Sequence, residues 1–378
     1  MAEIKELLEK RQAQGLLRKL SPVELRGQGK VWIKEKPLVD FCSNDYLGLS
    51  EHSGLKAAAI KAISEYGSSS SASRLASGDL VLHHQLEAKI ASWKNKPAAL
   101  VFNSGYQANT GIIPALYSSG DVIFLDRLAH ASMVDGVMLS QAKLFRFQHN
   151  DPTHLEGLLK KQRGNFKQAL IATESIFSMD GDRAPLKELV ELKEKYDCRI
   201  FLDEAHATGL FGKTGSGLAQ ELAVEEKIDL LMGTFSKALG SFGAYLAADK
   251  DVVDYLVNTC RSFIYSTGLP APVIAANLAA IEIVKHEPQR RQKVLLNAEY
   301  LRKGLKEKGF TVKGESQIVP LISEDNLLTL KLRDKLKKAG FWVLAVRPPT
   351  VPPGQARLRF SLNYWHSRQI LDNVINAL

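Results

Sequence analysis

The sequence predicts an α/β protein, with a large domain whose mostly parallel sheet is covered by helices and a smaller C-terminal α+β domain. The chain of 378 residues exceeds the roughly 100–200 residues of a single domain. Between residues 51 and 284, amphipathic helical patterns alternate with short apolar runs, which is typical of buried parallel strands. We therefore expect an N-terminal helix and connecting segment over residues 1–50, a large domain over 51–284 and a small domain over 285–378.

The first 50 residues are expected to form a helix and a pair of strands. An amphipathic pattern covers Met1–Leu20, and its acids lie among bases, unlike a signal peptide or an acid-poor transit peptide. Short apolar runs at residues 30–33 and 38–41 predict the two strands, and a turn-rich loop follows at 43–48.

The large domain is expected to alternate helices with strands. The helical patterns cover Leu55–Tyr66, Leu80–Trp93, Tyr106–Tyr117, Thr153–Gln162 and Pro185–Tyr196. The apolar runs are Ala99–Phe102, Val122–Leu125, Ala169–Ala172, Arg199–Leu202 and Leu230–Gly233. Because these runs are continuous rather than alternating, we expect strands that are buried on both faces of the sheet.

The C-terminal region is expected to begin after a helical stretch over residues 271–308 that is interrupted near Pro288. The elements that we expect after it are strands at 310–312 and 318–321, a helix at 325–339, strands at 342–346 and 357–362, and a terminal helix.

Composition indicates a globular protein that acts on small molecules. Apolar residues make up 45% of the chain and charged residues 24%, the usual balance for a chain that buries a core. The net charge is +9, but the bases are interspersed with acids. A solvated surface or an anionic substrate therefore explains the charge better than a nucleic-acid interface, which needs a clustered basic face.

The cysteines and the apolar stretches favour a cytoplasmic location. Cys42, Cys198 and Cys260 lie far apart and lack metal-ligand spacing, so we expect reduced thiols and no metal site. The most apolar stretch, residues 271–284, is shorter than the ~20 residues that span a bilayer.

Two adjacent strings imitate the motifs of a P-loop nucleotidase. Residues 207–214 resemble a phosphate-binding loop, and residues 200–206 resemble the strand that carries the magnesium ligand. In P-loop enzymes the loop follows its own strand, and the acid lies on a different strand downstream. Here the order is reversed and the strings abut, so the nucleotidase interpretation is disfavoured.

Lys237 and Asp203 form the chemical constellation that remains. Each comes at or just past the end of a predicted strand, where ligands bind in open α/β sheets. Small and apolar neighbours lower the pKa of a lysine toward a nucleophilic amine, and a buried carboxylate can hold a protonated pyridine nitrogen. Alone, Lys237 could equally be a surface lysine and Asp203 a strand-end cap. Together they match the pairing that pyridoxal phosphate requires.

Two further features fit the same cofactor. Residues 103–106 follow a strand and open a helix, which offers backbone N–H groups to a phosphate. His130 follows another strand, where its imidazole could stack on an aromatic ring or serve a purely structural role.

Nearly the whole chain resembles the α-oxoamine synthases, a family of fold-type I pyridoxal-phosphate enzymes with an aminotransferase-like fold. The most specific strings are Asn44–Leu49, Asp126–Ser132, Glu174–Asp182, Asp203–Gly209, Thr234–Lys237 and Tyr265–Thr267. The resemblance implies an acyltransferase that uses pyridoxal 5'-phosphate and works as a homodimer with shared active sites.

The resemblance also implies roles for individual residues. Lys237 would be the Schiff-base lysine, Asp203 would pair with the pyridinium nitrogen, and His130 would stack on the ring and help position substrate. His206 and Ser178 would hydrogen-bond the phenolic oxygen. The phosphate would be held by Gly105, Tyr106 and Thr234, and by Thr267 of the neighbouring subunit. The substrate α-carboxylate would meet Arg359 beside Asn44.

The string at residues 345–352 resembles the alanine-using branch of the family, which serves biotin synthesis with a pimeloyl thioester as acyl donor. In that branch the positions of Arg18 and Thr350 contact substrate. We expect Arg18, on the N-terminal helix, to meet the terminal carboxylate of pimelate, although an exposed surface base is the simpler alternative. Leu75 stands where some members carry His, which leaves the acyl-chain preference open. The sequence alone does not distinguish coenzyme A from a carrier protein as the acyl carrier. The alternative activity is that of the glycine-using 2-amino-3-oxobutyrate ligase or another α-oxoamine synthase.

Overall fold

A computed structural model of the chain describes residues 2–378, and their side chains from Ile4 onward. The chain divides into two compact units. The small unit comprises the residues up to Gly48, Ser178–Arg183 and Gln289–Leu378, and the large unit comprises Leu49–Phe177 and Ala184–Pro288. Each unit is described by itself, and Met1, where the first predicted helix was expected to begin, lies outside the described residues.

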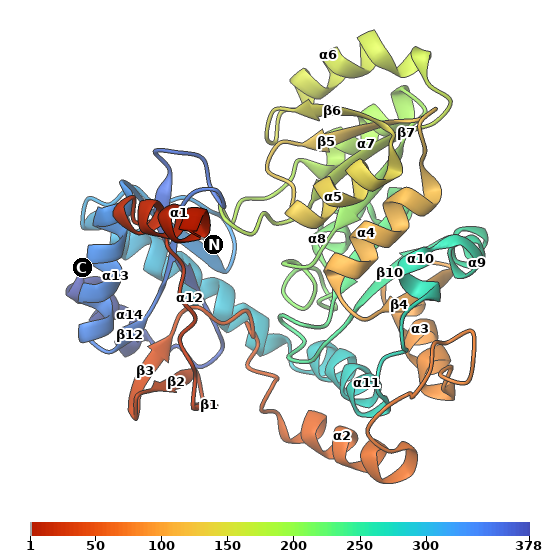
Figure 1. Cartoon of the computed structure of the whole chain (residues 1–378). Helices are drawn as coiled ribbons and strands as arrows, with labels where there is room; N and C mark the ends of the chain where they lie inside the picture. The colour runs from red at the N-terminus through yellow and green to blue at the C-terminus, as the bar shows by residue number, and fades with distance from the viewer. Residues whose placement is uncertain (1) are drawn as a thin grey trace. The chain divides into compact units, whose positions relative to one another are not determined.

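A seven-stranded sheet forms the centre of the large unit, in the order β4-β10-β9-β8-β7-β5-β6 (Figure 1). Its strands are β4 (Ala98–Phe102), β5 (Val122–Asp126), β6 (Lys143–Phe147), β7 (Ala169–Glu174), β8 (Arg199–Asp203), β9 (Leu230–Thr234) and β10 (Ala244–Ala248). All neighbours from β9 to β6 pair in parallel, and β10 is antiparallel to β4 and to β9. The predicted mostly parallel sheet is confirmed.

The prediction missed two strands of this sheet for different reasons. β10 reads Ala-Tyr-Leu-Ala-Ala, which is rich in alanine and therefore weak as a strand signal. β6 lies at the edge of the sheet and carries Lys143 and Arg146, so it lacks the apolar run of a buried strand.

Helices pack against the large unit's sheet and against one another. They are α2 (Ser53–Tyr66), α3 (Val81–Trp93), α4 (Gly105–Leu116), α5 (Ala131–Ser140), α6 (Pro152–Gln162), α7 (Leu186–Lys195), α8 (Leu218–Glu221), α9 (Lys250–Thr259), α10 (Arg261–Ile264) and α11 (Ala271–His286). The five predicted helices are confirmed within one or two residues at either end. α4 and α5 lie side by side (Figure 1), and their buried side chains join those of the strands in one hydrophobic core.

The small unit contains two sheets. Its strands are β1 (Leu25–Gly27), β2 (Lys30–Ile33), β3 (Lys36–Asp40), β11 (Ile318–Glu324), β12 (Phe341–Trp342), β13 (Leu344–Val346) and β14 (Ala356–Ser361). They pair in the orders β1-β2-β3-β12 and β11-β14-β13. Four helices accompany them: α1 (Ala2–Ala13), α12 (Pro288–Glu307), α13 (Asn326–Lys338) and α14 (Arg368–Ala377).

Three predictions for the small unit were wrong in detail. The first helix ends at Ala13 rather than Leu20, because Gly15 adopts a left-handed φ of 65°. Arg18 therefore lies beyond the helix. The expected strand at 310–312 is a single bridge between Val312 and Leu321. The expected strand at 342–346 is two strands that belong to different sheets.

In the part of the chain that the structure describes, no helix is both long enough and apolar enough to cross a membrane. Over residues 2–378, no group of three or more His, Cys, Asp or Glu side chains is arranged to hold a metal ion. The three cysteines are free thiols.

Candidate active site

The carboxyl ends of β8 and β9 bring the predicted lysine and histidine together in the large unit. The two strands pair in parallel, with Asp203 opposite Met232, so the loops that follow them leave the same edge of the sheet. Lys237 follows the end of β9, and its Nζ lies 3.0 Å from Nε2 of His206. An amine and an imidazole at this distance can share or exchange a proton.

Asp203 is a buried carboxylate held by neutral donors. Its side chain ends β8, and the residue is only 5% exposed. One carboxylate oxygen accepts the backbone N–H of Ala205 at 2.8 Å, and the other accepts the amide Nδ2 of Asn109 at 3.1 Å. These two bonds orient the carboxylate, and neither comes from a cation.

Asn109 was missed by the sequence analysis. It lies on α4, is 1% exposed, and also places its Nδ2 at 2.9 Å from the Ser132 hydroxyl on α5. Its Oδ1 has no hydrogen-bond partner. The available signal was a polar residue inside an apolar helical pattern, which is compatible with many structural roles.

His130 precedes α5 and caps it. Its Nδ1 accepts the backbone N–H of Ser132 at 3.3 Å and lies 2.8 Å from the Ser132 hydroxyl. Burial lowers the pKa of the His130 imidazole, and the nearby Lys237 lowers it further, while Asp203 raises it. The net direction favours a neutral ring, which suits stacking on an aromatic group.

Glu174 is a second acid that the sequence analysis did not single out. It ends β7 directly opposite Asp203 in the parallel register, is 3% exposed, and has a carboxylate oxygen without a hydrogen-bond partner. Burial raises the pKa of Glu174 well above its usual range, and the charge of Asp203 adds to this. The protonated form of Glu174 is therefore favoured.

The beginning of α4 offers groups that could hold a phosphate. Ser104 caps the helix by accepting the backbone N–H of Gln107 at 3.1 Å, and Gly105 opens it. The first N–H groups of a helix attract anions. Tyr106 is half exposed and places its hydroxyl on Asp135. Thr234 is buried, with its hydroxyl 2.7 Å from the carbonyl of Gly243.

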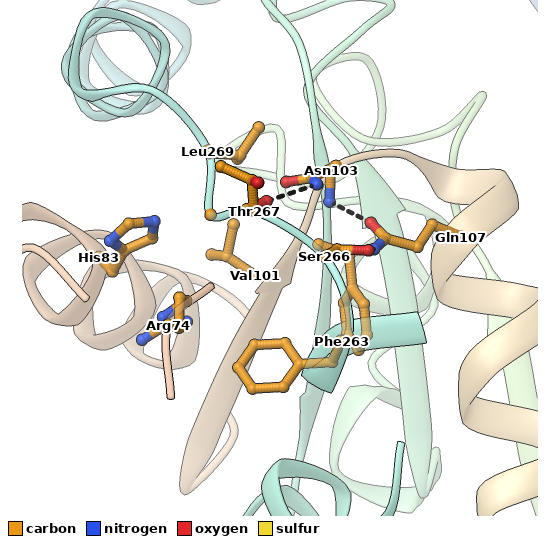
Figure 2. Close-up of a pocket in the computed structure, with 11 residues that line it drawn as sticks. Arg74, His83, Val101, Asn103, Gln107, Phe263, Ser266, Thr267 and Leu269 are labelled. Atoms are coloured by element: carbon orange, nitrogen blue, oxygen red, sulfur yellow. Dashed lines mark hydrogen bonds between the residues drawn. The ribbon is translucent and has the colours of Figure 1, made fainter. Parts of the chain in front are cut away.

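Thr267 lies at a small pocket beside the start of α4 (Figure 2). Its carbonyl accepts Nδ2 of Asn103 at 2.9 Å, and the residue is exposed. Arg74 lines the same pocket, but its guanidinium is already bound to Glu87 and, at 2.7 Å, to Asp79. The guanidinium of Arg74 therefore has its counter-ions within the chain, whereas Thr267 is exposed.

The small unit holds the remaining predicted residues in two groups. In the first, Arg359 is 3% exposed and places both terminal nitrogens 3.4 Å from Oδ1 of Asn44. Its Nε donates to the carbonyl of Ser178 at 2.6 Å. In the second, the Arg18 guanidinium donates to the Thr350 hydroxyl at 2.7 Å, and both residues are exposed.

The residues of the large unit fit pyridoxal phosphate. The test is Asp203, because a buried carboxylate whose hydrogen bonds come only from a backbone N–H and an amide suits a protonated ring nitrogen. Lys237 would supply the amine, His130 a neutral ring, and the start of α4 backbone N–H groups for the phosphate.

Comparison with known proteins shows the family of the chain. Residues 36–378 match the family model described as aminotransferase class I and II. The chain is 46% identical to the 8-amino-7-oxononanoate synthase of Geotalea daltonii, over 99% of this chain and 96% of that protein. It is also 46% identical to the enzyme of the same name from Geobacter sulfurreducens, over 98% and 95% of the two chains.

Two solved structures are similar over most of the chain. A serine palmitoyltransferase of S. paucimobilis with bound PLP and myriocin superposes with a TM-score of 0.93 at 29% identity, covering 99% of this chain and 95% of that one. An 8-amino-7-oxononanoate synthase from Francisella tularensis superposes with a TM-score of 0.78 at 30% identity, covering 90% and 95%.

Proposed function

Because the chain belongs to the 8-amino-7-oxononanoate synthases within the class I and II aminotransferase family, we propose that it condenses L-alanine with a pimeloyl thioester in biotin synthesis. A bond forms between the alanine Cα and the thioester carbonyl, the carbon–sulfur bond breaks, and the alanine carboxylate leaves as CO2. The products are 8-amino-7-oxononanoate and a free thiol. The identity of 46% over nearly the whole length carries this proposal.

The cofactor is pyridoxal phosphate, which supplies an electron-accepting ring for the pair left at the alanine Cα. The residues of the chain provide binding and proton transfer. Lys237 is the amine that holds the cofactor and then takes the Cα proton, supported by its contact with His206 at 3.0 Å. Asp203 keeps a positive charge on the ring nitrogen, and Asn109 keeps the Asp203 carboxylate oriented.

The remaining cofactor contacts follow from the family resemblance and are part of the proposal. His130 stacks on the ring, and His206 and Ser178 bind its phenolic oxygen. Gly105, Tyr106 and Thr234 hold the phosphate on one subunit, together with Thr267 of the neighbouring one. The exposure of Thr267 at the open pocket supports the last contact.

In this proposal each of the two substrate carboxylates is bound by a different arginine. Arg359 with Asn44 takes the α-carboxylate of alanine, which is supported by a buried guanidinium whose hydrogen bonds all go to neutral oxygens. Arg18 with Thr350 takes the terminal carboxylate of the pimeloyl group. The hydrogen bond between them supports a shared role.

We also propose a homodimer with shared active sites and a cytoplasmic location. Large apolar side chains are exposed on the segments that flank Thr267 and its bridge partner Ser73: Tyr265 is 73% exposed and Leu75 is 57% exposed. Such side chains suit a subunit interface. The free thiols support the location, because cytoplasmic proteins seldom carry disulfides.

The cofactor assignment is tested with the purified wild type and Lys237→Ala. The wild type should show a visible absorption band of bound pyridoxal phosphate, and the variant should lose this band while its far-ultraviolet circular dichroism stays the same. An unchanged visible spectrum in a folded variant would refute the role of Lys237.

The substrate assignment is tested by turnover with alanine, glycine and serine against a set of acyl thioesters. We expect turnover with alanine and a pimeloyl thioester of coenzyme A or of an acyl carrier protein. Preference for glycine would favour the alternative, a 2-amino-3-oxobutyrate ligase.

A further inference from the structure

We propose that a buried ion pair between Lys94 and Glu204 positions the catalytic side chains of Asp203 and His206, which lie before and after Glu204 in the sequence. Lys94 directly follows α3, and its Nζ lies 2.8 Å from Oε2 of Glu204. The Lys94 side chain is fully buried and that of Glu204 is 1% exposed. Glu204 directly follows Asp203 and precedes His206 by two residues. The inference rests on the proposed function, because it concerns residues that we assign to the cofactor.

The pair is connected to three separate segments of the large unit. The second oxygen of Glu204 accepts the backbone N–H of Ala219 at 2.9 Å. Lys94 donates to the carbonyl of Ser216 and, at 3.3 Å, to the hydroxyl of Thr208. The Thr208 hydroxyl in turn lies 3.0 Å from that of Tyr245 on β10. Each charged group therefore has several directional contacts, which fix the segment after β8 against its neighbours.

The backbone between Asp203 and His206 forms a turn that begins at Glu204. The carbonyl of Glu204 accepts the N–H groups of Ala207 and Thr208, both at 2.9 Å, and the N–H of Glu204 donates to Met232 on β9 at 2.8 Å. Displacement of the Glu204 side chain would pull on this turn. The turn carries His206, whose Nε2 faces Lys237.

The neighbouring glycine shows that the site is built around the carboxylate. Gly217 has a φ of 152°, and a Cβ atom there would lie 2.0 Å from Oε2 of Glu204. Only a glycine lets the chain pass this close to the Glu204 carboxylate.

Polar groups in the string at residues 207–214 are hydrogen-bonded within the protein, which does not favour a phosphate loop. The Thr208 hydroxyl is bound to Lys94 and Tyr245, and the N–H and hydroxyl of Thr214 both donate to Oε1 of Gln220 at 2.9 Å. These groups are occupied by the protein itself.

Stability alone is a weak reason for this arrangement. The solvation energy that two buried charges lose is about as large as the electrostatic attraction that they gain. A neutral pair of similar shape is therefore often as stable. Directional contacts next to catalytic groups are a better reason, since a misplacement of about 1 Å can cost roughly 100-fold in rate.

The test compares the wild-type holoenzyme with the double variant Lys94→Met/Glu204→Gln, which removes both charges and keeps similar shapes. We expect a melting temperature close to that of the wild type, kcat about 10- to 100-fold lower with little change in KM for alanine, and a shifted pH midpoint of the visible cofactor band. The matched control is Lys89→Met/Glu282→Gln, which removes an ion pair of 2.6 Å formed by the same helix α3. It should change none of these properties.

A folded double variant with wild-type kcat and a wild-type pH midpoint would overturn the inference. If the double variant fails to fold, Thr208→Val supplies the test, because it removes only the hydroxyl between Lys94 and Tyr245. A lower kcat and a shifted midpoint in Thr208→Val would support the positioning role, and wild-type values would refute it. If the wild type binds pyridoxal phosphate but does not condense alanine with a pimeloyl thioester, the proposed function fails, while the pH midpoint still decides the inference.

Discussion

At the scale of single residues, two buried arginines on β14 differ in the partners that their guanidinium groups bind. Arg357 and Arg359 lie two residues apart and are both buried, at 0% and 3% exposure. Arg357 pairs with the Asp180 carboxylate at 2.8 Å, whereas Arg359 donates to a carbonyl, an amide oxygen and hydroxyls. The first has its counter-ion within the chain. In our proposal the carboxylate of the substrate alanine is the counter-ion of the second.

This difference predicts that substitution by lysine weakens alanine binding at Arg359 but not at Arg357. Arg359→Lys should raise the alanine concentration needed for half-saturation by about 10-fold or more, because an ammonium cannot reproduce a planar two-donor contact. It should also lower the free energy of unfolding, because Arg359 donates buried hydrogen bonds as well. Arg357→Lys should leave alanine binding unchanged and lower the free energy of unfolding by about 1–3 kcal/mol through lost buried hydrogen bonds. Alanine titrations and urea unfolding of both variants measure this, and the reverse pattern would contradict the assignment of Arg359.

The sequence singles out candidate residues of the site more readily than it shows their surroundings. Lys237 and Asp203 stand out because they follow strands, and the structure brings Lys237 to 3.0 Å from His206. Asn109 and Glu174 could not be identified, because a single polar residue in an apolar helix or strand carries no signal of its partner. Their roles depend on register: Glu174 stands opposite Asp203 only because β7 and β8 pair as they do.

At the scale of elements, helical periodicity alone did not decide which helices could be predicted. α7 and α9 both have a clear apolar face, yet only α7 was predicted, and it ends within one residue of its expected end. α5 was missed because it is apolar nearly all round and is too short for a clear period. The end of α1 was misplaced because Gly15 and the following residues continue the amphipathic pattern while the backbone does not.

The close packing of α4 against α5 gives a prediction for two helical glycines. A Cβ at Gly136 on α5 would lie 2.5 Å from the carbonyl oxygen of Asn109 on α4, whereas a Cβ at Gly157 on α6 would meet no atom within 4 Å. Gly157→Ala should therefore raise the free energy of unfolding by about 0.5–1 kcal/mol through helix propensity. Gly136→Ala should lower it by about 1–3 kcal/mol, because the helices must separate.

Denaturant unfolding of both variants measures this difference. Equal effects of the two substitutions would show that α4 and α5 can separate without cost. A loss of visible cofactor absorption in Gly136→Ala alone would be consistent with displacement of Asn109, which binds Asp203.

At the scale of the whole molecule, the chain alternates between its two units. Ser178–Arg183 belongs to the small unit although the residues before and after it belong to the large one. The short excursion carries Ser178 and Asp180, which bind Arg359 and Arg357. A segment of this kind has no compositional boundary, so hydrophobic patterns alone could not assign it to the small unit.

The small unit also contains a buried histidine that should make its stability depend on pH. His366 is 0% exposed; its Nδ1 accepts the backbone N–H of Asn363, and its Nε2 lies 3.2 Å from the carbonyl of Asp40. Burial lowers the pKa of His366 from 6.5 to about 3. Below pH 6.5 the unfolded chain therefore binds a proton at His366 that the folded chain does not bind. The free energy of unfolding is unaffected by this group above pH 6.5 and falls as the pH drops toward 3.

The expected loss from this one group is about 1.4 kcal/mol for each pH unit below the unfolded value. Urea unfolding at pH 7.5 and at pH 5, followed by tryptophan fluorescence, measures it, since Trp32, Trp342 and Trp365 all belong to the small unit. The glutamine side chain of His366→Gln cannot be protonated, so the variant should lose less stability than the wild type between pH 7.5 and pH 5. We also expect the variant to be less stable than the wild type at pH 7.5. An equal loss in both proteins would mean that other groups cause the acid sensitivity of the small unit and that His366 does not contribute to it.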